Sequence, residues 1–285
     1  MVNANIQVNP KHIDSRDRSF AYGDGCFTTM FACEQRVFLL DQHIQRLQAD
    51  ARKLFIHFDN WHDVSEQIKQ IALGLHFPHV VKVVVSRGIG GRGYSPETCE
   101  QAEVYIFTFA SSAQNLQIDK PAQRLAFANV RMSSQPALSG IKHNNRLEQV
   151  IAKQECVQRK LNGEHIDDLL LLNNDGYLIE ATSANVFYEL EGEWYTPDLT
   201  SQGVDGVMRK HILSVMYDAG IPCHVALHKP DELRQIRSAF ICNAVQIIQV
   251  VSHIELQSQV IELCKKSTQK VFALTLDSLC RVDLD

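Results

Sequence analysis

Residues 139–148 read SGIKHNNRLE, and both the fold and the chemistry of this chain can be approached from this stretch. It places Lys142 in a loop of small and polar residues, directly before a segment that can start a helix. A lysine held where a loop meets a helix can be desolvated and lose its proton, and the resulting amine can bond covalently to a carbonyl carbon. Local sequence does not separate Lys142 securely from Lys82, which lies among valines, and an ordinary surface lysine is the alternative for either.

Composition describes a globular protein of ordinary size. The chain has 285 residues, 45% of them hydrophobic and 21% charged, which is long enough for two packed domains. The formal net charge of −5 gives no electrostatic reason to bind nucleic acid, and the basic residues form no cluster. We therefore expect a small-molecule partner and no nucleic acid.

Sequence signals for export, membranes and metals are missing. Residues 1–8, MVNANIQV, lack a basic patch followed by an apolar core, and no apolar run approaches the roughly 20 residues that span a bilayer. The eight cysteines are scattered without a CxxC pair, and the twelve histidines form no HExxH motif. We expect a cytoplasmic protein with reduced thiols, no membrane contact and no catalytic metal.

The first part of the chain predicts a small α/β domain at residues 1–113. Residues 25–40 alternate around a polar turn, which predicts a β-hairpin. Asp41 is expected to cap a helix that follows the hairpin, and Asn60 is expected to cap a second helix. Strand-like runs follow at residues 80–86 and 104–109.

A polar linker at residues 114–122 then leads to a larger domain at residues 123–285. Asn-Asp-Gly at residues 174–176 interrupts a strand-rich stretch and is a strong hairpin signal. A helix is expected from about residue 207 to residue 219. The expected fold class is therefore α/β (α+β), with a smaller N-terminal domain and a larger C-terminal domain built on a mixed sheet.

Three sites outside the lysine loop suit an anionic, electron-withdrawing cofactor. Arg46 follows His43 by one helical turn and could bind a phosphate, with a solvated surface arginine as the alternative. Glycines 203 and 206 lead into a helix whose free N–H groups would suit a phosphate, although glycine before a helix is also ordinary turn chemistry. Glu180 ends a strand and could pair with a protonated ring nitrogen, or could be a charge on an edge strand.

The glycine-rich loop at residues 86–95, SRGIGGRGYS, is the expected substrate-facing element. It combines backbone freedom with Arg87 and Arg92, which could receive carboxylates. It lacks the GK[ST] of a Walker loop and does not match GxGxxG in a βαβ unit, so nucleotide binding fits poorly.

Taken together, these segments resemble the fold-type IV pyridoxal-phosphate enzymes, the class IV aminotransferase family. The resemblance extends from about residue 14 to residue 250. The glycine-rich loop and the lysine stretch are similar to lyase members of the family rather than to its transaminases. The matching segments are YGDGCFTT at 22–29, HIQRL at 43–47, SRG and GRGYS within 86–95, GIKH and NRLEQ within 140–149, and ICNA at 241–244.

The resemblance implies the cofactor and the residues that hold it. Pyridoxal 5'-phosphate would be bound covalently by Lys142, and Glu180 would partner its pyridine nitrogen. Arg46 would be a phosphate ligand, together with backbone amides near Val207 and Met208. Met208 stands where transaminase relatives often carry threonine, so we expect backbone contacts to the phosphate there.

The resemblance also implies a reaction, the conversion of 4-amino-4-deoxychorismate into 4-aminobenzoate and pyruvate in folate biosynthesis. Thr29 would supply a proton to the departing enolpyruvyl group, and Arg92, Tyr94 and Asn243 would face the substrate. The family implies a homodimer with its sites near the subunit interface. The alternative within the family is a D-amino-acid or branched-chain aminotransferase.

Overall fold

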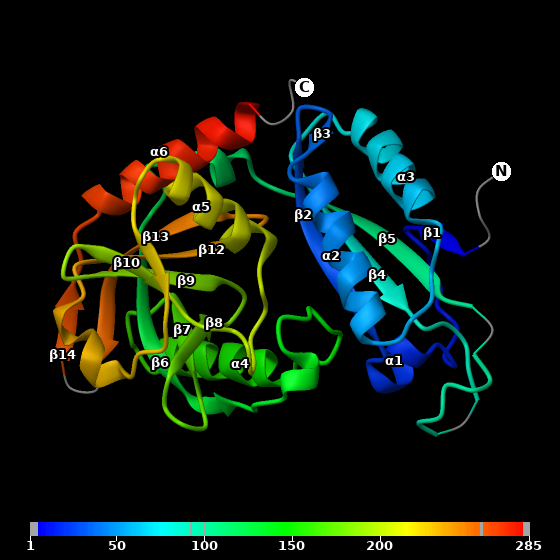
Figure 1. Cartoon of the computed structure of the whole chain (residues 1–285), viewed down its shortest axis with the longest axis horizontal. Helices are drawn as coiled ribbons and strands as arrows, with labels where there is room; N and C mark the ends of the chain where they lie inside the picture. Colours follow the sequence, from blue (N-terminus) through cyan, green and yellow to red (C-terminus); the bar gives the residue numbers. More distant parts are fainter. Residues whose placement is uncertain (1–4, 92, 100, 257–258, 282–285) are drawn as a thin grey trace. The chain divides into compact units, whose positions relative to one another are not determined.

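The structure is a computed structural model that describes residues 5–91, 93–99, 101–256 and 259–281 (Figure 1). The chain divides into two compact units. The N-terminal unit comprises Met1–Ala113 together with Ile141–Asn145, and the C-terminal unit comprises Gln114–Gly140 together with Arg146–Asp285. Lys142 therefore belongs to the N-terminal unit, although it lies close to the middle of the sequence, beyond the expected linker.

A five-stranded sheet in the order β1-β5-β4-β2-β3 forms the framework of the N-terminal unit. Neighbouring strands are antiparallel except for β1 and β5, which are parallel. The helices α2 and α3 lie beside each other in this unit (Figure 1). The elements are β1 (Ile6–Val8), α1 (Arg18–Tyr22), β2 (Gly25–Cys33), β3 (Arg36–Val37), α2 (Leu40–Lys53), α3 (Trp61–Leu73), β4 (His79–Ser86) and β5 (Glu103–Ala110).

The predicted hairpin is confirmed as the β2–β3 pair. Its turn residues Glu34 and Gln35 have φ of 54° and 63°, which matches the twist that a two-residue hairpin turn requires. The helix after the hairpin is also confirmed, but the prediction that Asp41 caps it is wrong. Leu39, with φ 56°, precedes the helix. Asp41 lies in the first turn of the helix, where an acidic side chain interacts favourably with the helix dipole.

Asn60 occupies the position before α3 as predicted, although its side chain makes no capping hydrogen bond. The apolar stripe of this helix is buried at Val64, Ile68 and Ala72. These residues recur at helical spacing, so the helix is held by packing of one face rather than by its cap.

The C-terminal unit is built on a mixed nine-stranded sheet in the order β11-β10-β9-β12-β13-β6-β7-β8, with β14 paired to β13. The pairs β13–β6, β6–β7 and β10–β11 are parallel, and the other pairs are antiparallel. The strands are β6 (Gln123–Met132), β7 (Asp168–Asn173), β8 (Leu178–Ala181), β9 (Asn185–Leu190), β10 (Glu193–Thr196), β11 (Cys223–Val225), β12 (Ser238–Asn243), β13 (Ile247–Leu256) and β14 (Gln259–Glu262).

Helices pack on this sheet at different strands. The helix α4 (Leu147–Leu161) packs on β6 and β7 through Ala152 and Cys156. The helices α5 (Val207–Asp218) and α6 (Lys266–Arg281) lie beside each other over β12 (Figure 1). The fold class expected from the sequence, a small α/β unit and a larger unit with a mixed sheet, is confirmed. No helix in the described ranges is both long enough and apolar enough to cross a membrane.

Candidate functional site

Lys142 is held by both of its backbone polar groups within the N-terminal unit. Its N–H donates to Oδ2 of Asp50 at 3.0 Å, and its carbonyl accepts from the N–H of Phe27 at 2.9 Å. An antiparallel bridge joins the next residue, His143, to Cys26 of β2. The lysine segment therefore continues the pairing along the edge of β2. The half-buried side chain places Nζ 4.8 Å from the centroid of the Phe27 ring.

The second candidate lysine faces the same aromatic ring. Lys82 pairs with Thr29 across β4 and β2, and its Nζ lies 4.9 Å from the Phe27 centroid. Burial lowers the pKa of Lys82 below its ordinary value. The two lysines that the sequence left open thus share one face of the sheet of the N-terminal unit, next to Phe27.

Thr29 lies on the same face of β2 as Phe27, because side chains two residues apart in a strand point the same way. Its neighbour Thr28 points to the other face and is fully buried. There the Thr28 hydroxyl lies 2.6 Å from Nδ1 of His43 on α2. Strand alternation therefore separates a threonine on the lysine face from a threonine that anchors the helix.

The inner face of α2 carries a buried polar cluster of His43, Arg46 and Asp50. The side chains of Arg46 and Asp50 are each 8% exposed, with Nε of Arg46 3.6 Å from Oδ2 of Asp50. Arg46 is therefore no solvated surface arginine. Burial lowers the pKa of His43 to about 3, and the charges of Arg46 and Lys142 contribute to this shift.

Glu180 lies on β8 of the C-terminal unit and is buried, with 4% of its surface exposed. Its Oε2 accepts from the N–H of Val204 at 2.9 Å, and its Oε1 accepts from Nε2 of Gln149 at 3.4 Å. A buried carboxylate that already accepts two hydrogen bonds can also accept one from a protonated ring nitrogen. The strand β8 is an edge strand of the sheet, as the alternative expected, but the Glu180 side chain is buried rather than solvated.

The loop before α5 comes close to Glu180. Gly203 has φ of 81°, and a Cβ there would lie 2.7 Å from a methyl group of Leu199 and 3.4 Å from Oε2 of Glu180. Gly206 precedes α5 without a side-chain capping hydrogen bond, so the first N–H groups of the helix, beginning at Val207, are not capped by that residue. Such a helix end suits a phosphate group.

The lysine stretch is tied to this loop within the C-terminal unit. The N–H of Gly140 donates to the carbonyl of Gly203 at 3.0 Å, and the N–H of Asp205 donates to the carbonyl of Gly140 at 3.1 Å. Lys142 follows Gly140 by two positions, so their Cα atoms can be no more than about 7 Å apart.

Asn243 ends β12, and its side-chain amide is occupied locally. Its Oδ1 accepts from the N–H groups of Val245 and Gln246 at 3.0 and 2.8 Å, and its Nδ2 donates to the carbonyl of Ser183 at 3.2 Å. It also lines a polar cavity of about 110 Å³ in this unit. An amide nitrogen has two hydrogens, so Nδ2 can serve a second acceptor, and a role toward substrate stays a prediction.

The glycine-rich loop is anchored by a residue that sequence reasoning missed. Buried Arg18 donates to the carbonyls of Gly93, Tyr94 and Ser95 at 3.0, 2.9 and 3.3 Å. The side chain of Tyr94 is 87% exposed and meets Tyr22 edge-on at 5.7 Å. The predicted site residue Arg92 lies outside the described residues.

The expectation that Arg87 receives a carboxylate of a substrate is wrong. Its guanidinium already binds both carboxylate oxygens of Asp24, at 2.8 and 2.9 Å. It also donates to the carbonyls of Leu54 and Phe55. The position of Arg87 at the end of β4 next to the turn after α2 explains this use, which no sequence signal indicates.

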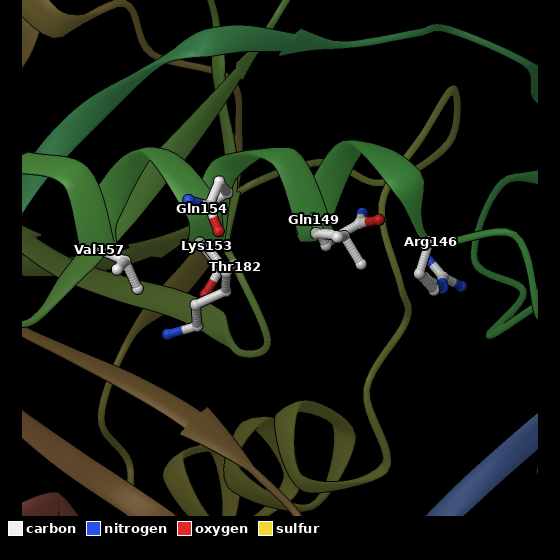
Figure 2. Close-up of a pocket in the computed structure, with 7 residues that line it drawn as sticks. Arg146, Gln149, Lys153, Gln154, Val157 and Thr182 are labelled. Atoms are coloured by element: carbon white, nitrogen blue, oxygen red, sulfur yellow. The ribbon is translucent and has the colours of Figure 1, made fainter.

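A shallow hollow of about 350 Å³ runs along one side of α4. Figure 2 shows its lining side chains, which project from successive turns of the helix, with Thr182 from the turn after β8 beside them. The same side of α4 exposes large apolar residues, with exposed fractions of 75% for Leu147, 59% for Val150, 49% for Val157 and 74% for Leu161.

The described residues fit pyridoxal 5'-phosphate. Glu180 is a buried carboxylate of the kind that could pair with the ring nitrogen, the N-terminus of α5 is a helix end of the kind that suits a phosphate, and Lys142 is an amine whose backbone is held by hydrogen bonds. Across the ranges that the structure covers, no group of three or more histidine, cysteine, aspartate or glutamate side chains could hold a metal ion.

Residues 25–254 match the family model of amino-transferase class IV. An aminodeoxychorismate lyase of Vibrio harveyi is 35% identical over 248 residues, covering 85% of this chain and 88% of that protein. The crystal structure of 4-amino-4-deoxychorismate lyase from Pseudomonas aeruginosa has a TM-score of 0.80 and 29% identity, covering 97% of each chain. The PLP-bound form of a hypothetical aminotransferase from Mycobacterium tuberculosis has a TM-score of 0.78 and 15% identity, covering 96% of this chain and 95% of that one, and therefore shares the fold.

Proposed function

The chain belongs to the class IV amino-transferase family, and from this premise we propose that it is a lyase converting 4-amino-4-deoxychorismate into 4-aminobenzoate and pyruvate in folate biosynthesis. One observation carries the proposal: Lys142 and Thr29 lie on the same face of β2, beside Phe27. An amine and a hydroxyl on one face can serve as base and acid. The identity to the Vibrio harveyi lyase favours this reaction over transamination.

Bound pyridoxal 5'-phosphate supplies a carbonyl carbon for amines and a ring that delocalises electrons. Lys142 is the amine that we propose to bind it, and the Glu180 carboxylate keeps its ring nitrogen protonated. Arg46 and the backbone N–H groups of Val207 and Met208 hold the phosphate. Met208 offers no hydroxyl, so its contribution is made by the main chain.

The proton transfers fall to two residues of the N-terminal unit. The free amine of Lys142 takes the proton from C4 of the substrate. The bond between C3 and the enolpyruvyl oxygen then breaks, and Thr29 supplies the proton that turns the departing group into pyruvate. The remaining ring becomes aromatic, which makes the elimination strongly downhill, so positioning and proton transfer are what the protein contributes.

The test is incubation of the loaded enzyme with 4-amino-4-deoxychorismate and no 2-oxo acid. We expect 4-aminobenzoate and pyruvate to form in equal amounts. A transaminase would need an amino acceptor, so absence of 4-aminobenzoate under these conditions would overturn the proposal.

Two lysine variants decide which amine binds the cofactor. Lys142→Ala is expected to lose the visible absorbance that pyridoxal 5'-phosphate acquires on bonding to a lysine, whereas Lys82→Ala is expected to keep it. Both lysines lie beside Phe27, so the pair is a matched control for substitution on that face. Persistence of the absorbance in Lys142→Ala would exclude Lys142.

We also propose that the chain works as a homodimer in which α4 meets its own copy. Five exposed residues of this helix, Leu147, Val150, Gln154, Val157 and Leu161, recur every three or four residues and form a seam, here called the α4 seam. The seam is symmetric in residue type about Gln154. In an antiparallel two-fold contact Leu147 would meet Leu161 and Val150 would meet Val157, and an amide can donate to and accept from its own copy.

The eight unpaired cysteines agree with a cytoplasmic location, which we also propose.

A further inference from the structure

Asp50 is a buried carboxylate that no step of the proposed reaction uses. One of its oxygens, Oδ2, accepts the backbone N–H of Lys142 at 3.0 Å and lies 3.6 Å from Nε of Arg46. Asp50 is 5% exposed overall. A buried carboxylate is costly to keep unless it is paired and hydrogen-bonded, and here a single oxygen serves both neighbours.

The groups around this carboxylate are either neutral or positively charged. Cys26 is neutral, because burial raises the pKa of its thiol and the charge of Asp50 raises it further. His43 is neutral at ordinary pH, because burial lowers its pKa to about 3. Arg46 and Lys142 then bring positive charge to the cluster, and Lys82 brings another cation to the Phe27 ring.

We propose that Asp50 is a positioning residue that ties the cofactor-binding lysine and the phosphate-binding arginine to one carboxylate oxygen. The proposal rests on the roles of Lys142 and Arg46 in the proposed function. The two groups would bind two different parts of the same cofactor, its carbonyl carbon and its phosphate, so a shared anchor sets their separation before the cofactor arrives.

Two substitutions separate the hydrogen bond from the charge. Asp50→Asn keeps an oxygen that can accept the N–H of Lys142 and removes the negative charge. Asp50→Ala removes both and leaves that N–H without this acceptor. Asp41→Asn is the matched control, because Asp41 lies exposed on the same helix.

The charge has its own signature in the pH dependence of cofactor capture. Only an unprotonated lysine can bond to the cofactor, so the rate at which apoprotein captures pyridoxal 5'-phosphate rises with pH. A carboxylate hydrogen-bonded to the backbone of Lys142 is a nearby negative charge, and a nearby negative charge favours the protonated form of an amine. Removal of that charge should therefore move the midpoint of capture to lower pH.

The experiment measures, for wild type and the three variants, the dissociation constant of pyridoxal 5'-phosphate, the pH midpoint of capture, and the thermal midpoint of the apoprotein. We expect Asp50→Ala to bind about tenfold more weakly or worse, by analogy with the loss of other groups that orient ligands. Asp50→Asn should fold, bind within a few-fold of wild type and show the lower pH midpoint, while Asp41→Asn matches wild type in affinity and in pH midpoint.

An unchanged pH midpoint in Asp50→Asn, or unchanged affinity in a folded Asp50→Ala, would overturn the proposal. Neither measurement contains substrate, so both are independent of which reaction the loaded enzyme catalyses. Absence of 4-aminobenzoate in the lyase assay of wild type would instead contradict the proposed function.

Discussion

His43 shows what full burial does to a single titratable side chain. Its ring lies beside the Thr28 hydroxyl and feels the charges of Arg46 and Lys142, and burial lowers its pKa to about 3 from the ordinary value of 6.5. The unfolded chain therefore binds one proton more than the folded chain between these two pH values. Its contribution to stability is complete above pH 6.5 and is lost as pH falls toward 3.

A pH series on His43→Gln tests this linkage. Glutamine can still reach the Thr28 hydroxyl but does not titrate, so the variant lacks the destabilising slope. We expect the stability advantage of wild type in urea unfolding to shrink below pH 6.5 by up to about 1.4 kcal/mol per pH unit. His62→Gln, at an exposed position of α3, is the matched control for replacing a histidine on a helix of this unit. Parallel pH curves for wild type and His43→Gln would contradict the argument.

Arginines illustrate where residue type alone misleads. Arg46 and Arg87 both had the chemistry of an anion ligand in the sequence. In the structure, Arg87 joins the end of β4 to the turn after α2 through hydrogen bonds to Asp24 and to two carbonyls. Arg18, which no motif marked, holds the glycine-rich loop instead. Which guanidinium meets a carbonyl depends on contacts between segments distant in sequence, and local patterns carry no information on those.

At the scale of elements, the sequence predicted what periodicity and turn chemistry control. The hairpin at β2–β3, the helix α5 and the strands β4 and β5 follow directly from alternation, helical spacing and glycine placement. The start of α2 differs from the prediction, because Leu39, which is buried like Phe38, adopts a left-handed conformation directly before the helix. The order of the mixed sheet was not predictable, since strand pairing is set by contacts far apart in the chain.

The loop between β10 and α5 offers a test of close backbone approach. Gly203→Ala puts a Cβ against Leu199 and Ile179 beside the Glu180 carboxylate, at a φ of 81°. Gly163→Ala has a similar φ of 91° and open space around it, so it measures conformational strain alone. We expect about 1 kcal/mol of destabilisation at Gly163 and roughly 2–4 kcal/mol at Gly203, where crowding adds to strain. Cofactor affinity should fall only in Gly203→Ala, and equal losses of stability in urea unfolding would contradict the crowding argument.

At the scale of the whole molecule, the chain passes twice between its units around the lysine. Residues Ile141–Asn145 belong to the N-terminal unit, while Gly140 and Arg146 on either side belong to the C-terminal unit. The sequence predicts a second domain at residues 123–285, which would include Lys142. This division into contiguous domains stays a prediction. A five-residue excursion carries no composition shift or linker signal, and contacts such as the β-bridge to Cys26 and the hydrogen bond to Asp50 reveal it.

Assembly is the property of the whole molecule that the α4 seam addresses. Val157→Arg places a charge in the middle of the seam, next to Gln154 and the proposed two-fold axis. Since desolvating an unpaired charge in an interface is costly, we expect the dimer to dissociate to monomer at concentrations where wild type stays paired. Val225→Arg is the matched control, because Val225 of β11 is 53% exposed against 49% for Val157 and lies outside the seam. Sedimentation velocity over a range of concentrations checks this prediction. A dimer that persists in Val157→Arg, or that is lost equally in Val225→Arg, would place the contact elsewhere on the surface.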